Sequence, residues 1–277
     1  IDDLKVSTYN VLNLESVPAV YGVDSQTGLR YLREPARIKP EGEIRGVAEQ
    51  ISREDPDILF LQEVQTMDSL ELLTKTHLGD RYRAILVEGN DGRGIDIAIL
   101  VKRDLPFDLE VQSHRNLSMR NKLTGGQDLT FSRDLPVLTI RRPGKPEPVM
   151  AFMGQHLKSQ KDSEIKAGGR VVVDERSVQK RGAQAQASAR IYAEEVRPSA
   201  PGMPVVMLGD MNATVPAAPE LEPVRRAGFV DSFLLAPNKP AITDTHSYLP
   251  NGQPPQHNQL DMVAVAEGKA KGIVKSA

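Results

Sequence analysis

The chain has no cysteine and no tryptophan, and aromatic residues make up only 4% of its 277 residues. Without cysteine it can form no disulfide, no thiolate metal site and no cysteine nucleophile. Few aromatic side chains are available for stacking nucleic-acid bases. These absences exclude thiol chemistry and weaken a base-stacking role, while they leave the redox compartment open.

Long hydrophobic runs and a strong excess of one charge are also missing. No apolar run approaches the roughly 18 residues of a membrane-spanning helix, so we expect no membrane span. The net charge of -2 and the pI near 6.3 give no global positive field for a polyanion, although a local patch or a bound metal could provide one. The chain begins with Ile1, as either a removed signal peptide or trimming would leave it, and we favour a secreted or periplasmic location.

Short apolar segments of strand length recur along the chain, and helical patterns are fewer. An early alternation of strand and helix gives way to consecutive strands between 82 and 156, which favours mixed sheets with hairpins over a doubly wound parallel sheet. We expect a single domain over 1–277. The predicted strands are 4–12, 57–64, 82–88, 94–101, 135–140, 148–156, 204–210 and 259–266; the helices are 40–53, 67–78, 174–196 and 218–229; the long loops are 15–36, 113–132 and 235–256.

Polar side chains close several of these strands. In "VVMLGDMN" a buried strand ends in Asp210 and Asn212, which point the same way on an extended chain. They could begin a turn, or they could bind a ligand at the end of the strand. The other strand-end candidates are Asn10 and Asn13 in "STYNVLN", Glu63 in "ILFLQE", His156 in "FMGQH" and Asp261 in "NQLD".

Each of these residues has an ordinary structural explanation when it is taken alone. Glu63 could be an exposed strand end, and His156 could be a histidine of the core. A carboxylate in or at the end of a buried strand is costly, however, unless it is paired or bound to a cation. Several strand ends that each supply a hard oxygen or an imidazole match the needs of a Mg²⁺ or Mn²⁺ phosphoester site.

The sequences of six segments, and their order along the chain, resemble those of a known protein family. The segments "TYNVLNL", "DILFLQEV", "GIDIAIL", "QHLKS", "GDMNA" and "QLDMVAV" resemble the endonuclease/exonuclease/phosphatase superfamily of DNase I-like nucleases and metal-dependent phosphodiesterases. The resemblance runs from about residue 4 to 266 and looks closest to bacterial, often exported members. It implies an α/β (α+β) fold, a four-layer sandwich of two packed mixed β-sheets flanked by helices.

The resemblance also implies a role for each strand-end residue. Asn10 and Glu63 would hold the divalent cation, which is Mg²⁺ or Mn²⁺ with Ca²⁺ as an alternative. Asp210 would orient or deprotonate the attacking water, and Asn212 would contact the scissile phosphate. His156 matches the position where DNase I-like members place a histidine near the leaving group or the phosphate.

Asp261 matches the carboxylate that orients a catalytic histidine in the family, but the family's closing Ser-Asp-His motif is not present in this chain. No Asp and no His follows Asp261. We favour a fragment that lacks its last strand, which in the family packs beside the first one. Two alternatives stay open: His156, His246 or His257 takes over the role, or the protein is a non-catalytic member.

Further side chains are candidates for substrate binding. Arg133 suits a phosphate because its fork matches two oxygens, although a surface arginine is an equal alternative. Asn13, Lys158 and Arg181 are the other candidates, and Arg181 could instead lie on a solvated helix face. The basic loop 113–122 could contact a polyanion, or it could simply be solvated.

We therefore expect a divalent-metal-dependent phosphodiester hydrolase, in the first place a nuclease, that acts as a monomer on nucleic acid or a small phosphodiester. One alternative is a phosphoesterase for a small or lipid-like phosphate ester, which the acidic pI and the scarce aromatics favour. The other is a non-catalytic member that binds a phosphate ligand.

Overall fold

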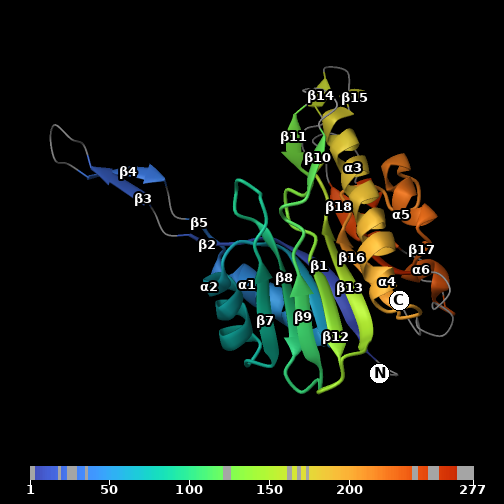
Figure 1. Cartoon of the computed structure of the whole chain (residues 1–277). Helices are drawn as coiled ribbons and strands as arrows, with labels where there is room; N and C mark the ends of the chain where they lie inside the picture. The colour runs from blue at the N-terminus through green and yellow to red at the C-terminus, as the bar shows by residue number, and fades with distance from the viewer. Residues whose placement is uncertain are drawn as a thin grey trace.

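The computed structural model describes residues 4–17, 20–23, 30–34, 37–120, 126–160, 164–166, 170–172, 175–238, 243–248 and 256–266. Two larger β-sheets pack face to face, and helices cover their outer faces (Figure 1). This four-layer arrangement confirms the predicted fold class. Within the described residues, no helix combines the length and the apolarity needed to cross a membrane.

The first sheet has the strand order β1-β6-β8-β7. Strand β1 runs parallel to β6, and the other two pairs are antiparallel. In the described part of this sheet β1 is an edge strand. The bounds are β1 (Val6–Leu14), β6 (Ile58–Val64), β8 (Asp96–Lys102) and β7 (Tyr82–Val87).

The second sheet has the order β17-β20-β16-β13-β12-β9, in which only β13 and β16 run parallel. Strands β9 and β17 were not expected from the sequence. Strand β9 alternates exposed and half-buried residues at the sheet edge, so it shows no apolar run. The bounds are β17 (Phe229–Asp231), β20 (Asp261–Ala266), β16 (Val205–Asp210), β13 (Pro148–His156), β12 (Val137–Arg141) and β9 (Asp108–Gln112).

Each predicted helical segment is helical in the structure, and the short helices α4 and α6 were not predicted. In α1 the apolar residues Ile44, Val47 and Ile51 are buried on one face, as their spacing predicts. The bounds are α1 (Glu41–Glu54), α2 (Met67–Glu71) continuing as the π-helical η1 (Leu72–His77), α3 (Glu175–Ile191) continuing as η2 (Tyr192–Val196) and α4 (Arg197–Ser199), η3 (Pro219–Leu221), α5 (Glu222–Arg226) and α6 (Ser232–Leu235).

Short two-stranded ladders occupy much of the three segments expected to be loops, so the expectation is wrong for these described stretches. Polar sequence hid the ladders, because a small hairpin buries little and needs no apolar run. The hairpin of β3 and β4 projects away from the body (Figure 1). The pairs at these segments are β2 (Ser16–Val17) with β5 (Arg37–Ile38), β3 (Val20–Val23) with β4 (Arg30–Glu34), β10 (Ser118–Arg120) with β11 (Gln127–Leu129), and β18 (His246–Tyr248) with β19 (Gln256–Asn258). A further pair, β14 (Glu164–Lys166) with β15 (Arg170–Val172), lies outside the three segments.

Apolar side chains from both faces of the central strands bind the layers together. Along β6, Phe60 packs between the sheets, while Leu59 and Leu61 pack toward the helices. Phe60 meets Phe152 of β13 with ring centroids 6.4 Å apart. A Cβ at Gly154 would lie 2.9 Å from the Phe60 ring, so glycine is needed for this close approach. The sheets are therefore held in a fixed relation, which fixes where their strands end.

Candidate active site

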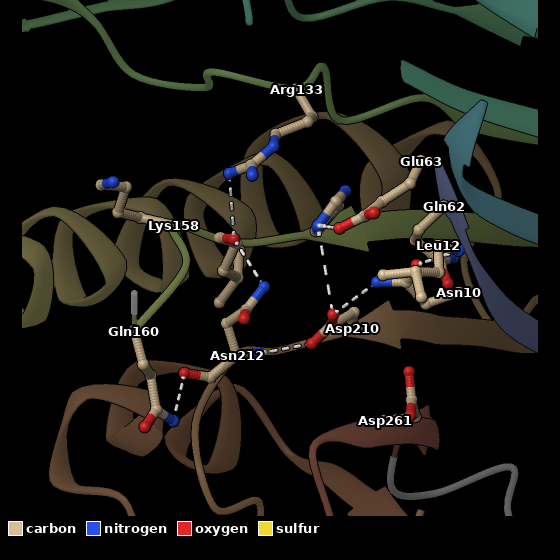
Figure 2. A network of polar contacts seen from close by, with 12 residues as sticks. Asn10, Leu12, Gln62, Glu63, Arg133, Lys158, Gln160, Asp210, Asn212 and Asp261 are labelled. Carbon is tan, nitrogen blue, oxygen red and sulfur yellow. Dashed lines mark hydrogen bonds and ion pairs between the residues drawn. The ribbon is translucent and has the colours of Figure 1, made fainter. Parts of the chain in front are cut away.

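Strands of both sheets end at one edge of the sandwich and bring the predicted polar residues together (Figure 2). His156 lies opposite Asp210 in the β13–β16 register, and Asp261 lies opposite Asp210 on the other side. Asn10 at β1 donates its Nδ2 hydrogen bond to Asp210 Oδ2 at 3.0 Å. These two residues are 200 positions apart, so only the packing of the two sheets makes them neighbours.

Glu63 lies at an irregularity of β6, where the pairing to β8 shifts between Gln62 and Val64. Its backbone has φ +66°, a left-handed conformation that is uncommon for a residue with a side chain. The backbone N–H of Asn13 donates to Glu63 Oε2 at 3.1 Å. The kink thus re-aims the carboxylate near the strand end, and the backbone of the neighbouring strand β1 holds it there.

Left-handed backbone is concentrated at this edge. Besides Glu63, non-glycine residues with positive φ include Leu12 at +50°, Asn13 at +56° and Asn212 at +49°. Each such conformation costs on the order of 1–3 kcal/mol and persists only where the surroundings impose it. Strain of this kind clusters at functional sites, which supports a functional role for this edge of the sandwich.

Asp210 is buried at the end of β16 and is tightly oriented. Its Oδ1 accepts the backbone N–H of Asn212 at 2.7 Å, and its Oδ2 accepts the bond from Asn10. Burial raises the pKa of the Asp210 carboxyl above its usual value, and the two hydrogen bonds oppose that rise. The preceding Gly209 has φ +139°, and a Cβ there would lie 1.9 Å from the carbonyl oxygen of Gln155. The approach to Asp210 thus requires glycine.

His156 is only 2% exposed and faces two carboxylates without contacting them directly. Its Nε2 lies 4.0 Å from Glu63 Oε1 and 4.0 Å from Asp210 Oδ2. Both separations are too long for a hydrogen bond. Burial, and then the charge of Arg133, lower the pKa of His156 well below its usual value, so the imidazole is neutral at pH 7. Within the described ranges, its Nδ1 has no hydrogen-bond partner.

The carbonyl of Leu157 joins two of the predicted phosphate-binding side chains. It accepts a hydrogen bond from Asn212 Nδ2 at 3.1 Å and a longer one from Arg133 Nη1 at 3.4 Å (Figure 2). Gln160 Nε2 donates to the carbonyl of Asn212 at 2.7 Å. Asn212 is therefore held at its side chain by Leu157 and at its backbone by Gln160. Leu157 directly follows His156, so this bond keeps the Asn212 side chain near the end of β13.

Arg133 is 2% exposed, so the interpretation as a surface arginine is wrong. Its Nε lies 3.1 Å from Asp91 Oδ2, which is its counter-ion. Charges of Glu63 and Asp210 also act on Arg133, which places it beside the site. The sequence could not reveal this burial, because "FSRDLP" is polar around the arginine and the covering residues come from other segments.

Asp261 lies at the first position of β20 beside Asp210 (Figure 2). Burial, and then the neighbouring charge of Asp210, raise the pKa of Asp261 to about 7. Its backbone N–H donates to Thr245 Oγ1 at 2.9 Å. Its Oδ1 is buried and has no hydrogen-bond partner in the part of the chain that the structure describes. The expected histidine partner is therefore not found among these residues, and His257 instead bonds Ser247 at 2.8 Å.

The remaining substrate-binding candidates have other contacts. Arg181 is 3% exposed, and its Nε and Nη2 donate to Glu220 Oε1 at 3.1 and 3.0 Å. Its Nη1 donates to the carbonyls of Lys158 and Ser159 at 3.2 and 3.5 Å, so the guanidinium supports the segment that follows His156, and the interpretation as a solvated helix face is wrong. The backbone N–H of Lys158 donates to Gln184 at 2.8 Å. Asn13 contributes its backbone N–H to Glu63.

Sequence reasoning missed the loop between β7 and β8. There Asp91 accepts hydrogen bonds from Arg93 and also pairs with Arg133. The only signal was the turn-forming "NDGRG", which marks a tight loop without indicating that it reaches the site.

The donor set at Glu63 and Asn10 fits a hard divalent cation. Among the described residues, no three His, Cys, Asp or Glu side chains gather into a metal cage. Mg²⁺ does not require one, since it commonly binds through one or two carboxylates and keeps waters for substrate phosphates. Glu63 Oε1 is free of the backbone bond that holds Oε2, and the carboxylate of Asp210 lies nearby. The amide oxygen of Asn10 accepts the backbone N–H of Leu12 at 3.0 Å and has a second lone pair for a cation, so these residues fit a site with one carboxylate and one amide oxygen.

A family model described as the endonuclease/exonuclease/phosphatase family matches residues 7–256. The chain belongs to this family. Its members are metal-dependent phosphoesterases and typically use divalent metals. The recognition of the family from six short segments is thereby confirmed. No curated protein sequence matches the chain.

Solved structures of this family share the fold. A truncated TDP2 from Caenorhabditis elegans is similar with a TM-score of 0.57 and 20% identity, covering 96% of this chain and 84% of that one. A family protein from Bacteroides thetaiotaomicron gives a TM-score of 0.60 at 17% identity, with 95% and 81% covered. A mannosyl-6-phosphatase of the same bacterium gives 0.57 at 16% identity, with 96% and 86% covered. At these low identities the similarity supports the shared fold only. The substrate has to be inferred from the residues of the site.

Proposed function

We propose that this protein is a divalent-metal-dependent phosphodiester hydrolase, in the first place a nuclease, and that it acts as a monomer. The observation that carries the proposal is the meeting of Asn10, Glu63, His156, Asp210 and Asn212 at one edge of the sandwich. A buried carboxylate, a neutral imidazole and an amide around one point suit the attack of water on a phosphodiester.

Asp210 is the proposed base for the attacking water. Its raised pKa brings it closer to the operating pH, which favours general-base catalysis. Two hydrogen bonds hold the carboxylate in place, so little rearrangement is needed when it takes a proton. The neutral imidazole of His156 and the amide of Asn212 are proposed to hold phosphate oxygens through N–H donors.

Glu63 and Asn10 are the proposed ligands of the cation. When bound, the cation neutralises charge on a non-bridging phosphate oxygen. Arg133 adds a fixed positive charge behind the site, at no cost in side-chain ordering because it is already buried and paired. Asp261 is proposed to hold a proton beside Asp210 near neutral pH, rather than to orient a histidine within the described residues.

A phosphoesterase for a small phosphate ester is the second candidate. The net charge of -2 and the 4% of aromatic residues favour a small substrate over a long polyanion. The similar fold of a mannosyl-6-phosphatase is compatible with such a substrate class.

The test is hydrolysis of supercoiled plasmid and of bis(p-nitrophenyl) phosphate with Mg²⁺ or Mn²⁺, with EDTA as the control. We expect EDTA-sensitive cleavage, and a loss of about 10²–10⁴-fold in kcat for Asp210→Asn. Asp231→Asn is the matched control, because Asp231 is a half-buried carboxylate of the same sheet that bonds Gln259 and Phe233 instead. Cleavage of neither substrate by the wild-type protein would contradict the proposal.

A further inference from the structure

Arg93 is a half-exposed cation beside the site that the proposed chemistry does not use. Its side chain is 47% exposed. Its Nε donates to Asp91 Oδ1 at 3.1 Å and its Nη2 to Asp91 Oδ2 at 3.3 Å. These bonds occupy one edge of the guanidinium fork. Among the residues described, Nη1 has no hydrogen-bond partner, so donors remain for a ligand.

The loop that carries Arg93 is held rigidly at several points. Gln65 Nε2 donates to the carbonyl of Arg93 at 2.8 Å, which ties the loop to the end of β6 two residues after Glu63. Asn90 donates its backbone N–H to Ser132 at 2.6 Å. Gly94 has φ +71° and closes the turn by donating to the carbonyl of Asp91 at 2.8 Å. Arg93 therefore needs little ordering to bind a ligand.

One carboxylate serves two guanidinium groups here. Asp91 binds Arg93 through both oxygens and also contacts the buried Arg133 through Oδ2, so the three groups together carry one positive charge. The hydrogen bonds to Asp91 raise the pKa of Arg93, and the carboxylate of Glu63 adds to the effect. The charge of Arg93 also acts on His156. Arg93 thus lies close enough to interact electrostatically with both Glu63 and His156 of the proposed site.

We propose that Arg93 binds a second phosphate of the substrate, next to the scissile one. The inner guanidinium, Arg133, is buried beside His156 and Asn212, where the scissile phosphate is proposed to bind. Arg93 shares Asp91 Oδ2 with Arg133 but is exposed where Arg133 is buried, which suits a phosphate that follows along a chain. Its free fork edge offers the paired N–H donors that phosphate oxygens accept. The inference rests on the proposed function and narrows its substrate to a diester with more than one phosphate.

The test compares thymidine 5′-(p-nitrophenyl phosphate) with its 3′-phosphorylated form, which share the leaving group and differ by one phosphate. For Arg93→Ala we expect KM for the 3′-phosphorylated substrate to rise about 10- to 100-fold, with kcat within about twofold. KM for the other substrate should change much less. Arg93→Lys should recover part of the loss, because it restores the charge without the fork.

Arg103→Ala is the matched control. Arg103 follows the opposite end of β8, its side chain is 50% exposed, and it pairs with Asp80 at 2.8 Å. Its removal deletes the same charge and should leave both KM values unchanged. Equal KM changes for the two substrates in Arg93→Ala, or no change in either, would overturn the inference.

A binding measurement separates this inference from the proposed hydrolase activity. If the wild-type protein hydrolyses neither substrate, the proposed function fails. Calorimetry then measures the affinity for thymidine 3′,5′-bisphosphate in EDTA, which tests phosphate binding by Arg93 without any hydrolysis. An affinity loss of about 10-fold or more in Arg93→Ala and none in Arg103→Ala supports the inference, whereas equal affinities in all three proteins contradict it.

Discussion

At the end of the sandwich where β6 begins and β8 ends, which we call the paired end, charged side chains form ion pairs and range from partly buried to half-exposed. Lys102 contacts Asp55 at 2.9 Å and Asp57 at 3.0 Å, and Arg81 contacts Asp55 at 3.1 Å. At the opposite end of the same strands, Asp210 and His156 are buried. Within the described residues, His156 and Asp261 each keep a buried polar atom without a hydrogen-bond partner.

Backbone strain also differs between these two ends, and it is greater at the end with the buried polar residues. At the paired end, Asp55 and Asp80 have positive φ. Asp55 is the C-cap of α1, where a left-handed residue is common, and Asp80 lies in an exposed turn before β7. At the other end, Glu63 and Asn212 take positive φ beside buried charges. Buried, incompletely paired polar groups and strained backbone both cost stability. These costly features are concentrated at the end of the sandwich that holds the proposed site. The following experiments test whether the residues there serve catalysis.

The largest difference between the two ends is expected for the glutamate at the end of β6. Glu63→Gln should abolish Mg²⁺ binding in calorimetry and lower kcat by about 10³-fold or more, because it removes the only carboxylate among the proposed cation ligands. The control Asp57→Asn changes a carboxylate just before β6 begins and should leave both quantities near wild type. Unchanged Mg²⁺ binding in Glu63→Gln would sink the assignment.

The next largest effect is expected for the buried arginine of the site. Arg133→Ala should lower the free energy of unfolding by about 3–5 kcal/mol, because it removes a buried charge from its partner Asp91. Arg181→Ala removes another buried arginine, which pairs with Glu220, and should destabilise the protein to a similar extent. Urea denaturation measures both losses.

Activity separates the two arginines. At a temperature where both variants are folded, Arg133→Ala should lose about 10- to 100-fold in kcat/KM. Arg181→Ala should lose much less activity, because its guanidinium bonds Glu220 and the carbonyls of Lys158 and Ser159 and makes no contact with Asp91. Equal activity losses in the two variants would mean that Arg133 matters only for stability.

A smaller effect concerns the pH dependence of stability. Asp261 has a pKa of about 7 in the folded protein, above its unfolded value near 3.9. The folded state therefore holds a proton that the unfolded state has released, so this contribution is fully present below about pH 4 and is lost as the pH rises through about 7. The free energy of unfolding should fall by about 2–4 kcal/mol over that range in EDTA.

Asp261→Asn keeps the shape without the ionisable proton, so the decline should be smaller in the variant by the contribution of Asp261. The decline that remains belongs to other carboxyls such as Asp96, whose pKa burial raises to about 6. Denaturation in urea at several pH values measures the decline. Asp80→Asn, an exposed carboxylate at the paired end, should retain the wild-type slope. The same decline in wild type and Asp261→Asn would assign it to another group.

The smallest effect is expected at the paired end. Arg81→Ala breaks an exposed ion pair with Asp55, and both side chains are about half exposed. Such pairs contribute roughly 0–1 kcal/mol, and the contribution should shrink further at high salt. A loss of several kcal/mol in Arg81→Ala would remove the contrast between the two ends.

Local sequence patterns were enough to predict the main strands and helices. The four apolar residues before Gln62 and Glu63 predicted a strand buried on both faces, and β6 packs against both core layers. The spacing of Ile44, Val47 and Ile51 predicted α1 in the same way. Six short segments in order were enough to recognise the family that the comparison confirmed.

The same patterns could not decide which polar residues are buried. Arg133 and Arg181 both stand among polar neighbours in the sequence, yet both are almost fully buried. Their partners Asp91 and Glu220 come from distant segments, so no local pattern predicts the pairing. Short hairpins such as β10 and β11 escaped prediction for a related reason, because they bury too little to leave an apolar signature.

The sequence alone determined most strands of the two larger sheets, the polar residues that close them and the family of the chain, because periodicity and motif order are local properties. The tertiary structure decided that Asn10 and Asp210 touch, that His156 is neutral and that one aspartate serves both Arg93 and Arg133. Hydrogen bonding and desolvation depend on distances in space, and the stacking of two sheets sets those distances between residues up to 200 positions apart.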